Sequence, residues 1–223
     1  ATMMLLCDQS KMIWEKQILR KLEIPDSFLA EIVMPGTLIG PIQPQVCDEL
    51  GIEAIPVVAP ATHDTASAVT GMPVVDTTKN WAFISMGTWS IVGVETPTPI
   101  ITDAVFNADY GNNAIGDGRN MMVNYITGLW IIQQCRHRWI IEAGRDISWD
   151  EIVRQSEKAG PAHAYINVDD PAFGEVNADM PAAVVAYCEH TGQRLENSVG
   201  TVSRCVYESL VLKYREKLET LEK

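Results

Sequence analysis

The sequence predicts an α/β fold, and three stretches indicate it. Residues 55–69 join a short apolar run bounded by prolines, typical of a buried strand, to a small apolar stretch typical of a closely packed helix. Residues 81–94 have the pattern of strand, turn and strand, and residues 128–143 that of a long helix. In open α/β sheets ligands bind outside the carboxyl ends of the strands, so the polar residues after the first strand are candidates for a site.

The composition is that of an ordinary folded protein. The chain has 223 residues, of which 47% are hydrophobic and 21% charged, enough for a sizeable core in one or two domains and inconsistent with disorder. Its 17 basic and 29 acidic residues give a formal net charge of −12, which argues against partners such as nucleic acids or anionic membranes. An anionic substrate would therefore need local backbone donors or a metal ion.

The cysteines and the apolar runs bear on location. The five cysteines lie far apart without a Cys-x-x-Cys pair, and this odd number favours reduced thiols in a cytoplasmic protein over a disulfide framework or a zinc site. No apolar run reaches membrane-spanning length, and the run at residues 3–6 is too short for a signal peptide. We expect a cytoplasmic protein.

The first quarter of the chain predicts short elements. Apolar residues within 10–22 fall mostly on one helical face, and four-residue spacing favours a second helix over 26–33 before Pro35 and Gly36. Residues 38–42 are expected to be extended. A short helix is expected at 44–50, closed by Gly51.

The sequence pattern changes after residue 71, which marks a candidate domain boundary, so we predict domains at 1–71 and 72–223.

Residues 102–120 are polar and rich in glycine. A calcium loop starting at Asp109 fails because Asn120 stands where a bidentate glutamate is required, so a surface loop is expected there.

Start and stop signals predict the C-terminal helices. Ser148 and Glu151 have capping-box spacing, and Gly160 closes the helix that they open. Residues 167–171 predict a turn. Asp179 precedes a helix with proline in its first turn, and a last helix is expected from about residue 198 to the end of the chain.

His63 and Asp64 are the strongest chemical candidates. An aspartate is the usual proton acceptor when an alcohol attacks phosphorus, and a histidine could orient the alcohol. On spacing alone, capping of the next helix by Asp64 or Thr65 is the more common explanation. A structural role for His63 is equally open.

Two further stretches suit nucleotide or sugar binding. Gly87 at a tight turn would let backbone N–H groups approach a phosphate, and Thr88 adds a hydroxyl. The alternative is an ordinary hairpin turn before a buried Trp89. Asn124 and Gln133 flank the start of the long helix, where amides could bond a sugar or a nucleotide; helix capping by Asn124 and solvent exposure of Gln133 are the local alternatives.

Several familiar signatures are absent from the sequence. It contains no P-loop, no Gly-x-Gly-x-x-Gly dinucleotide fingerprint and no Gly-x-Ser-x-Gly nucleophile elbow. Hydrolase and dehydrogenase functions are disfavoured accordingly.

The candidate stretches occur together and in a recognisable order. Ala-Thr-His-Asp-Thr-Ala-Ser-Ala-Val at 61–69 is followed by Ser-Met-Gly-Thr-Trp-Ser at 85–90 and Gly-Leu-Trp-Ile-Ile-Gln at 128–133. Further matching segments are 166–173, 191–193 and 204–214. In these features the chain resembles the FGGY family of carbohydrate kinases, in particular the branch whose substrate is L-rhamnulose.

This resemblance implies an actin-like, ribonuclease-H-like fold of two α/β domains that close over a cleft. It implies Asp64 as the general base, with His63, Asp64 and Thr65 in contact with the sugar. Gly87, Thr88 and Gln133 would contact ATP, and Mg²⁺ would accompany the nucleotide without a separate protein metal site.

The implied reaction is ATP-dependent phosphorylation of L-rhamnulose to L-rhamnulose 1-phosphate. The family branch has a sugar-binding Asn three residues before Gly-Leu-Trp, where this sequence has Tyr125 and places Asn124 one residue earlier. Either Asn124 takes the role after a local shift, or the sugar differs. L-Fuculose, D-xylulose and a non-catalytic sugar- or partner-binding role are the alternatives.

The resemblance also implies that the sequence is incomplete at both ends. Residues 1–71 would be the end of the sugar-binding domain and residues 72–223 the beginning and middle of the ATP-binding domain. A glycine-rich phosphate motif and a Gly-Gly adenosine motif would lie outside the chain, so we expect these residues to be inactive alone. Sugar and ATP are the expected partners, as a monomer or homodimer, without nucleic acid or membrane.

Overall fold

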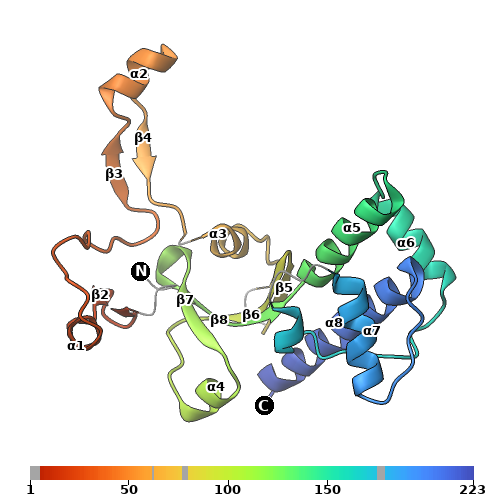
Figure 1. Cartoon of the computed structure of the whole chain (residues 1–223). Helices are drawn as coiled ribbons and strands as arrows, with labels where there is room; N and C mark the ends of the chain where they lie inside the picture. Colours follow the sequence, from red (N-terminus) through yellow and green to blue (C-terminus); the bar gives the residue numbers. More distant parts are fainter. Residues whose placement is uncertain (1–5, 62, 77–79, 175–178) are drawn as a thin grey trace. The chain divides into compact units, whose positions relative to one another are not determined.

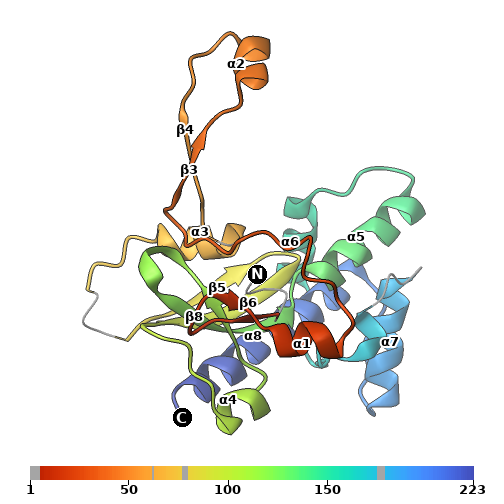
Figure 2. The same ribbon diagram turned by 90° about the vertical axis from the view of Figure 1, so that its left-hand side faces the viewer.

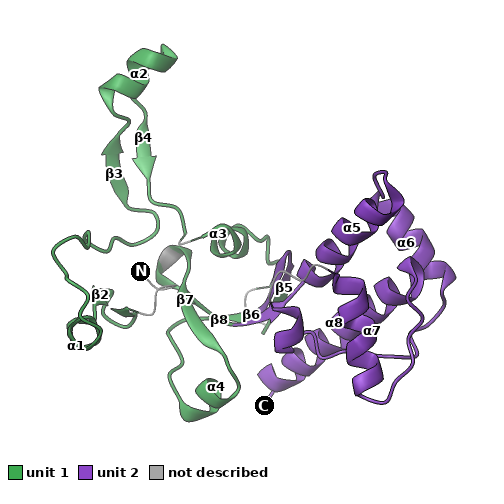
Figure 3. Ribbon diagram, in the orientation of Figure 1, with its two compact units in different colours: residues 1–83, 93–123 green, residues 84–92, 124–223 purple. Residues whose placement is uncertain are grey.

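The structure of the protein, a computed structural model, describes residues 6–61, 63–76, 80–174 and 179–223. The chain divides into two compact units (Figure 3). Unit 1 contains residues 1–83 and 93–123, and unit 2 contains residues 84–92 and 124–223. The domain boundary near residue 72 stays a prediction, since these units describe packing within this chain.

The first elements of unit 1 differ from the predicted helices. β1 (Cys7–Asp8) and β2 (Ile13–Trp14) form an antiparallel pair, and α1 (Lys16–Lys21) follows with Glu15 as its N-cap. The predicted helix over 10–22 is therefore only partly correct. Asp8 Oδ1 accepts the Ser10 N–H at 3.0 Å, and Met12 has a φ of 52°, so a turn replaces the first helical turns.

The predicted helix over 26–33 is wrong. Phe28, expected on its apolar face, is 68% exposed, so it is not buried against a core. The Ala30 carbonyl instead accepts the Trp14 indole N–H at 2.8 Å. A short helix is marginal in water without a buried apolar face, so local periodicity was not sufficient here.

The next elements follow the prediction more closely. β3 (Leu38–Pro41), α2 (Pro44–Leu50) and β4 (Pro56–Val58) occur where the sequence places them, and Gly51 ends α2 with a left-handed φ of 64°. β3 and β4 pair antiparallel and are joined through α2 (Figures 1 and 2). β4 is not the buried strand that was expected: in the described part of the chain it pairs with β3 alone, and Val58 is 52% exposed.

A four-stranded sheet follows the short helix α3 (Asp64–Thr70). Its strands are β5 (Ala82–Met86), β6 (Trp89–Thr96), β7 (Gly111–Ala114) and β8 (Asn120–Thr127). Their order is β5-β6-β8-β7, and β7 pairs antiparallel with β8, Gly111 opposite Val123. The predicted strand, turn and strand over 81–94 are confirmed.

The surface loop expected at 102–120 is wrong. The segment contains α4 (Asp103–Asn107), strand β7 and the 3₁₀ turn η2 (Gly116–Gly118). Its polar residues serve the backbone. Thr102 caps α4, and the Asn112 amide both accepts from Ile100 N–H and donates to Ile100 C=O at 2.9 Å. Asp103, Asn107 and Asp109 are exposed as expected, but the polar composition does not prevent regular structure here.

Unit 2 is mainly helical. Its elements after β8 are α5 (Trp130–Ala143), α6 (Trp149–Lys158), the 3₁₀ turn η3 (Pro171–Phe173), α7 (Met180–His190) and α8 (Val199–Leu221). The predicted starts are confirmed: the side chains of Ser148, Asp179 and Ser198 each accept a first-turn N–H.

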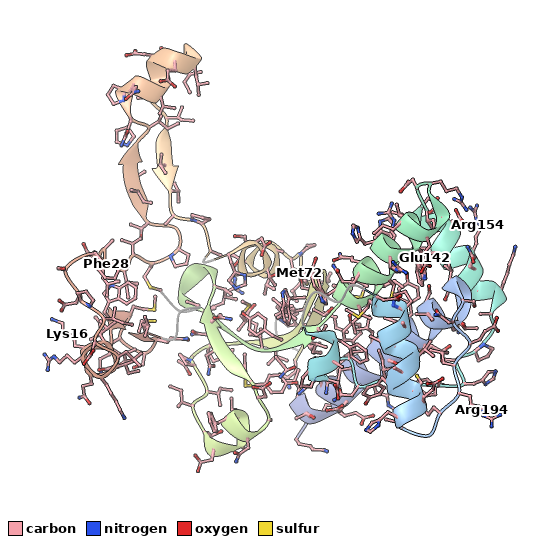
Figure 4. All side chains as sticks on the ribbon, viewed as in Figure 1. Lys16, Phe28, Met72, Glu142, Arg154 and Arg194 are labelled. Carbon is pink, nitrogen blue, oxygen red and sulfur yellow. The ribbon has the colours of Figure 1, made fainter. Side chains whose placement is uncertain are left out.

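The core of unit 2 lies between these helices. Side chains from all of them fill the interior, whereas charged groups such as Glu142, Arg154 and Arg194 lie at the periphery (Figure 4). α6 packs against α8 across Gly200, where an added Cβ would lie 2.6 Å from the Gln155 carbonyl oxygen. All five cysteines are free thiols. Among the described residues, no helix is long and apolar enough to cross a membrane.

Candidate active site

The first group of candidate residues lies at the start of α3 in unit 1. His63 is the N-cap of this helix, and its Nδ1 accepts the Ala66 N–H at 3.4 Å. Capping by Asp64 or Thr65, the local alternative to catalysis, is therefore wrong. Asp64 is instead the first residue of the helix, where a carboxylate is favoured by the helix dipole. Thr62 lies outside the described residues.

The Asp64 carboxylate has one oxygen held and one available. Its side chain is 99% exposed. Oδ1 accepts the Thr65 N–H at 2.6 Å, which fixes the orientation of the carboxylate. Within the described residues Oδ2 has no hydrogen-bond partner. An oriented carboxylate with a free lone pair is suited to accept a proton from a bound hydroxyl.

The hydrogen bond at Nδ1 determines which nitrogen of His63 can donate. Because Nδ1 accepts the Ala66 N–H, the ring proton of the neutral form belongs on Nε2. The side chain is only 17% exposed, and Nε2 is shielded from solvent with no partner in the described part of the chain. The capping explanation for His63 thus holds for one nitrogen and leaves the other without a partner among the described residues.

The second group lies in unit 2, at the turn between β5 and β6. The Thr88 hydroxyl, on the exposed side of this turn, donates to Gln133 Oε1 at 3.2 Å. Gln133 lies in the first turn of α5, 45 residues further along the chain. The structure therefore brings together two of the three predicted ATP contacts by a side-chain hydrogen bond, with Gly87 next to them in the chain.

The turn is bound to the start of α5 through the backbone. Leu129 N–H donates to Gly87 C=O at 2.8 Å, and Trp130 N–H donates to Thr88 C=O at 3.1 Å. Gly128 makes this approach possible: an added Cβ would lie 2.5 Å from Ser90 Oγ and 2.6 Å from Gly87 O. This role of Gly128 was not predicted from the sequence, although a glycine between a strand and a helix is a usable signal.

Two further contacts support this region and were missed. The Ser90 and Tyr214 hydroxyls lie 2.6 Å apart in the interior, and burial raises the pKa of Tyr214. Asp169 accepts the Thr127 N–H at 2.9 Å and pairs with Lys213 at 3.2 Å. These partners are 42 to 124 residues apart in the sequence, so no local pattern could have found them.

Asn124 is not in the first turn of α5. It lies in β8 and is 1% exposed, whereas Tyr125 is 38% exposed. Successive strand residues point to opposite faces, so the two side chains cannot exchange places without a change of register. Capping of the long helix by Asn124 is thus wrong, since Leu129 is the N-cap residue. Its predicted contact with the sugar stays a prediction.

The described residues include no group of three or more His, Cys, Asp or Glu side chains arranged to hold a metal ion. Mg²⁺ commonly keeps water and nucleotide phosphates as most of its ligands, with one or two carboxylates from the protein. The exposed Asp64 carboxylate in unit 1 is a donor of that kind.

Comparison with known proteins identifies the family. Residues 82–223 match the FGGY family of carbohydrate kinases, C-terminal domain. The chain belongs to the FGGY family of carbohydrate kinases. The resemblance inferred from the motifs is thereby confirmed.

Relatives with assigned names are bacterial kinases. A rhamnulokinase of Bacteroides thetaiotaomicron is 36% identical over 207 residues, which cover 93% of this chain and 41% of that protein. A rhamnulokinase of Enterococcus faecalis is 32% identical with the same coverage. The chain thus spans about two fifths of the length of the relatives that it matches.

The fold agrees with solved FGGY structures. A ligand-bound xylulose kinase from Lactobacillus acidophilus matches with a TM-score of 0.62 at 15% identity, over 97% of this chain and 42% of that one. The predicted α/β, actin-like sugar kinase fold is confirmed.

Proposed function

We propose that the protein phosphorylates a ketose sugar with ATP, and that the sugar is L-rhamnulose, converted to L-rhamnulose 1-phosphate. The observation that carries the proposal is the Asp64 carboxylate, fixed through Oδ1 and free at Oδ2, in a chain of this kinase family. Its named relatives at 36% and 32% identity, both rhamnulokinases, support the choice of sugar.

Asp64 acts as the general base. The attacking hydroxyl of the sugar donates a hydrogen bond to Oδ2. The carboxylate takes the proton as the sugar oxygen bonds to the γ-phosphorus of ATP, while the bond from that phosphorus to the bridging oxygen breaks and ADP leaves. A base of ordinary strength is sufficient, because the transition state of phosphoryl transfer is loose and the proton leaves late. His63 donates from Nε2 to a second sugar oxygen and Thr65 adds a hydroxyl, which together orient the sugar.

Gly87, Thr88 and Gln133 bind the nucleotide. ATP with Mg²⁺ supplies the phosphoryl group and neutralises charge that a protein with a net charge of −12 does not offset. The backbone at Gly87 approaches a phosphate closely. Gln133 on α5 provides side-chain N–H donors, and the Thr88 hydroxyl, which donates to Gln133, provides an acceptor on a turn fixed to α5. In this proposal residues 1–71 belong to the sugar-binding domain and residues 72–223 to the ATP-binding domain.

A kinase for another ketose is the second candidate. Tyr125 takes the position where the branch acting on L-rhamnulose has a sugar-binding asparagine, and the neighbouring Asn124 is buried. L-Fuculose and D-xylulose are the alternatives that this difference favours. A non-catalytic sugar- or partner-binding role is the alternative from another functional class.

The five free thiols agree with a reducing cytoplasm as the site of action.

A substrate panel tests the proposal. The full-length protein is assayed with Mg²⁺ and ATP on L-rhamnulose, L-fuculose and D-xylulose, with ADP release and sugar phosphate both measured. We expect the highest kcat/KM on L-rhamnulose. A higher value on another ketose would support the second candidate. Measurable sugar binding by calorimetry without ADP release on any sugar would contradict kinase function and favour a binding protein.

A further inference from the structure

The helix that carries the proposed base is fixed at its other end by a side-chain hydroxyl. Thr70, the last residue of α3, donates from Oγ1 to the Ala66 carbonyl at 2.8 Å and accepts the Gly116 N–H at 3.0 Å. The Thr70 hydroxyl therefore donates its proton within α3 and accepts a hydrogen bond from η2. Figures 1 and 2 show α3 beside the connection between β7 and β8, where η2 lies.

Position 116 has no room for a side chain beside Thr70, so glycine is required there. An added Cβ would lie 2.4 Å from Thr70 Cγ2, far inside van der Waals contact. Its φ is outside the left-handed region, so the backbone conformation alone would accept other residues. The two residues therefore fit each other: the glycine admits the threonine methyl group, and the threonine oxygen pairs the glycine amide.

The η2 side of this contact is itself anchored. Ile115 is completely buried, and its N–H donates to the Arg119 carbonyl at 3.0 Å, which closes the turn. The Arg119 guanidinium pairs with Glu95 of β6 at 2.6 Å. The turn that contains Gly116 is thus held in place by buried Ile115 and by the ion pair with β6. The contact with Thr70 attaches α3 to this turn.

The helix depends on such contacts for its position. It has seven residues, so its first and last residues are roughly 9 Å apart at 1.5 Å per residue, and a helix of this length is not stable alone. It buries only Ala66 and Val69. A shift at Thr70 would move the short helix as a body, and Asp64 with it.

We propose that Thr70 and Gly116 are positioning residues for the phosphoryl transfer, holding α3 so that Asp64 meets the attacking hydroxyl. This rests on the proposed function of Asp64 as base. Neither residue touches the substrate in this account. Their contribution is to kcat, because proton transfer depends on placement at the scale of an ångström, whereas sugar and ATP affinity come from other side chains.

Four variants of the full-length protein separate the methyl group from the hydroxyl. Thr70→Val keeps the shape and loses both hydrogen bonds, and Thr70→Ser keeps the bonds and loses the methyl group. Gly116→Ala introduces the clash, and the double variant Thr70→Ser/Gly116→Ala removes it, leaving the next neighbours at 3.3 and 3.5 Å.

We expect Thr70→Val and Gly116→Ala to lower kcat by about 10- to 100-fold, with KM for sugar and ATP within about twofold. Thr70→Ser should retain near wild-type kcat, and the double variant should recover most of the loss caused by Gly116→Ala. Unchanged kcat in both single variants, or a double variant as slow as Gly116→Ala, would overturn the proposal.

Hydrogen exchange gives a readout that does not need activity. The Gly116 amide should exchange about 2- to 10-fold faster in Thr70→Val than in the wild type, because it loses its acceptor. An active enzyme whose Gly116 amide is unaffected would overturn the Thr70–Gly116 contact alone. A wild-type protein that phosphorylates no sugar, with the exchange effect present, would overturn the proposed function instead. If Gly116→Ala does not fold, the Thr70→Val and Thr70→Ser pair decides.

Discussion

At the scale of single residues, the candidate site is built from side chains that satisfy the local backbone with one atom and leave another for chemistry. His63 caps α3 through Nδ1 and keeps Nε2. Asp64 binds the Thr65 amide through Oδ1 and keeps Oδ2. A structural and a catalytic explanation of such residues are therefore compatible.

The Thr88–Gln133 hydrogen bond gives a prediction at this scale. Gln133→Ala should raise KM for ATP by about 2- to 10-fold, the range expected for loss of one neutral hydrogen bond, and leave KM for the sugar unchanged. Gln134→Ala is the matched control, since Gln134 is the next residue of α5 and is not predicted to contact ATP. Steady-state kinetics of the full-length protein measure both. Equal effects of the two variants would contradict a nucleotide contact at Gln133.

At the scale of elements, close approach at glycine decides which segments pack. Gly128 lets the start of α5 meet the β5–β6 turn, and Gly200 lets α8 cross α6. In each case a backbone carbonyl oxygen lies 2.6 Å from the added Cβ, and a backbone atom cannot rotate away as a side chain would. These positions are therefore more constrained than helix propensity alone suggests.

Gly200→Ala tests this at the α6–α8 crossing. Alanine would gain up to about 1 kcal/mol from helix propensity, but overpacking commonly costs about 1–3 kcal/mol, and contact with a carbonyl at 2.6 Å lies at the severe end. We expect a lower free energy of unfolding and a lower Tm by calorimetry. Gly111→Ala is the control, because nothing lies within 4 Å of an added Cβ there. A Tm equal to that of the control would contradict the steric argument.

At the scale of the whole molecule, the sequence predicted those elements whose signals are local. Helix caps at Ser148, Asp179 and Ser198 and the strand, turn and strand over 81–94 are of this kind. Predictions that relied on apolar spacing or a short apolar run without a known partner failed, as for the helix at 26–33 and the buried strand at the start of residues 55–69. The partners of Thr70, Ser90 and Thr127 lie far away in the chain, so the supporting contacts of the site were not predictable.

Membership of the FGGY family is also a property of the whole chain. The motifs at 61–69, 85–90 and 128–133 are each weak alone, and their order indicates the FGGY family. The chain spans about two fifths of its relatives' length, so activity is a property to test in the full-length protein.

The most direct test of the account is the kcat of Asp64→Asn in the full-length protein. Loss of the base should lower kcat by about 10²- to 10⁴-fold, while the calorimetric Kd of the sugar stays within about threefold. Asp103→Asn is the matched control, an exposed carboxylate at the first position of the short helix α4, and it should keep wild-type kcat. A kcat for Asp64→Asn within a few-fold of wild type would contradict the assignment of Asp64 as the general base.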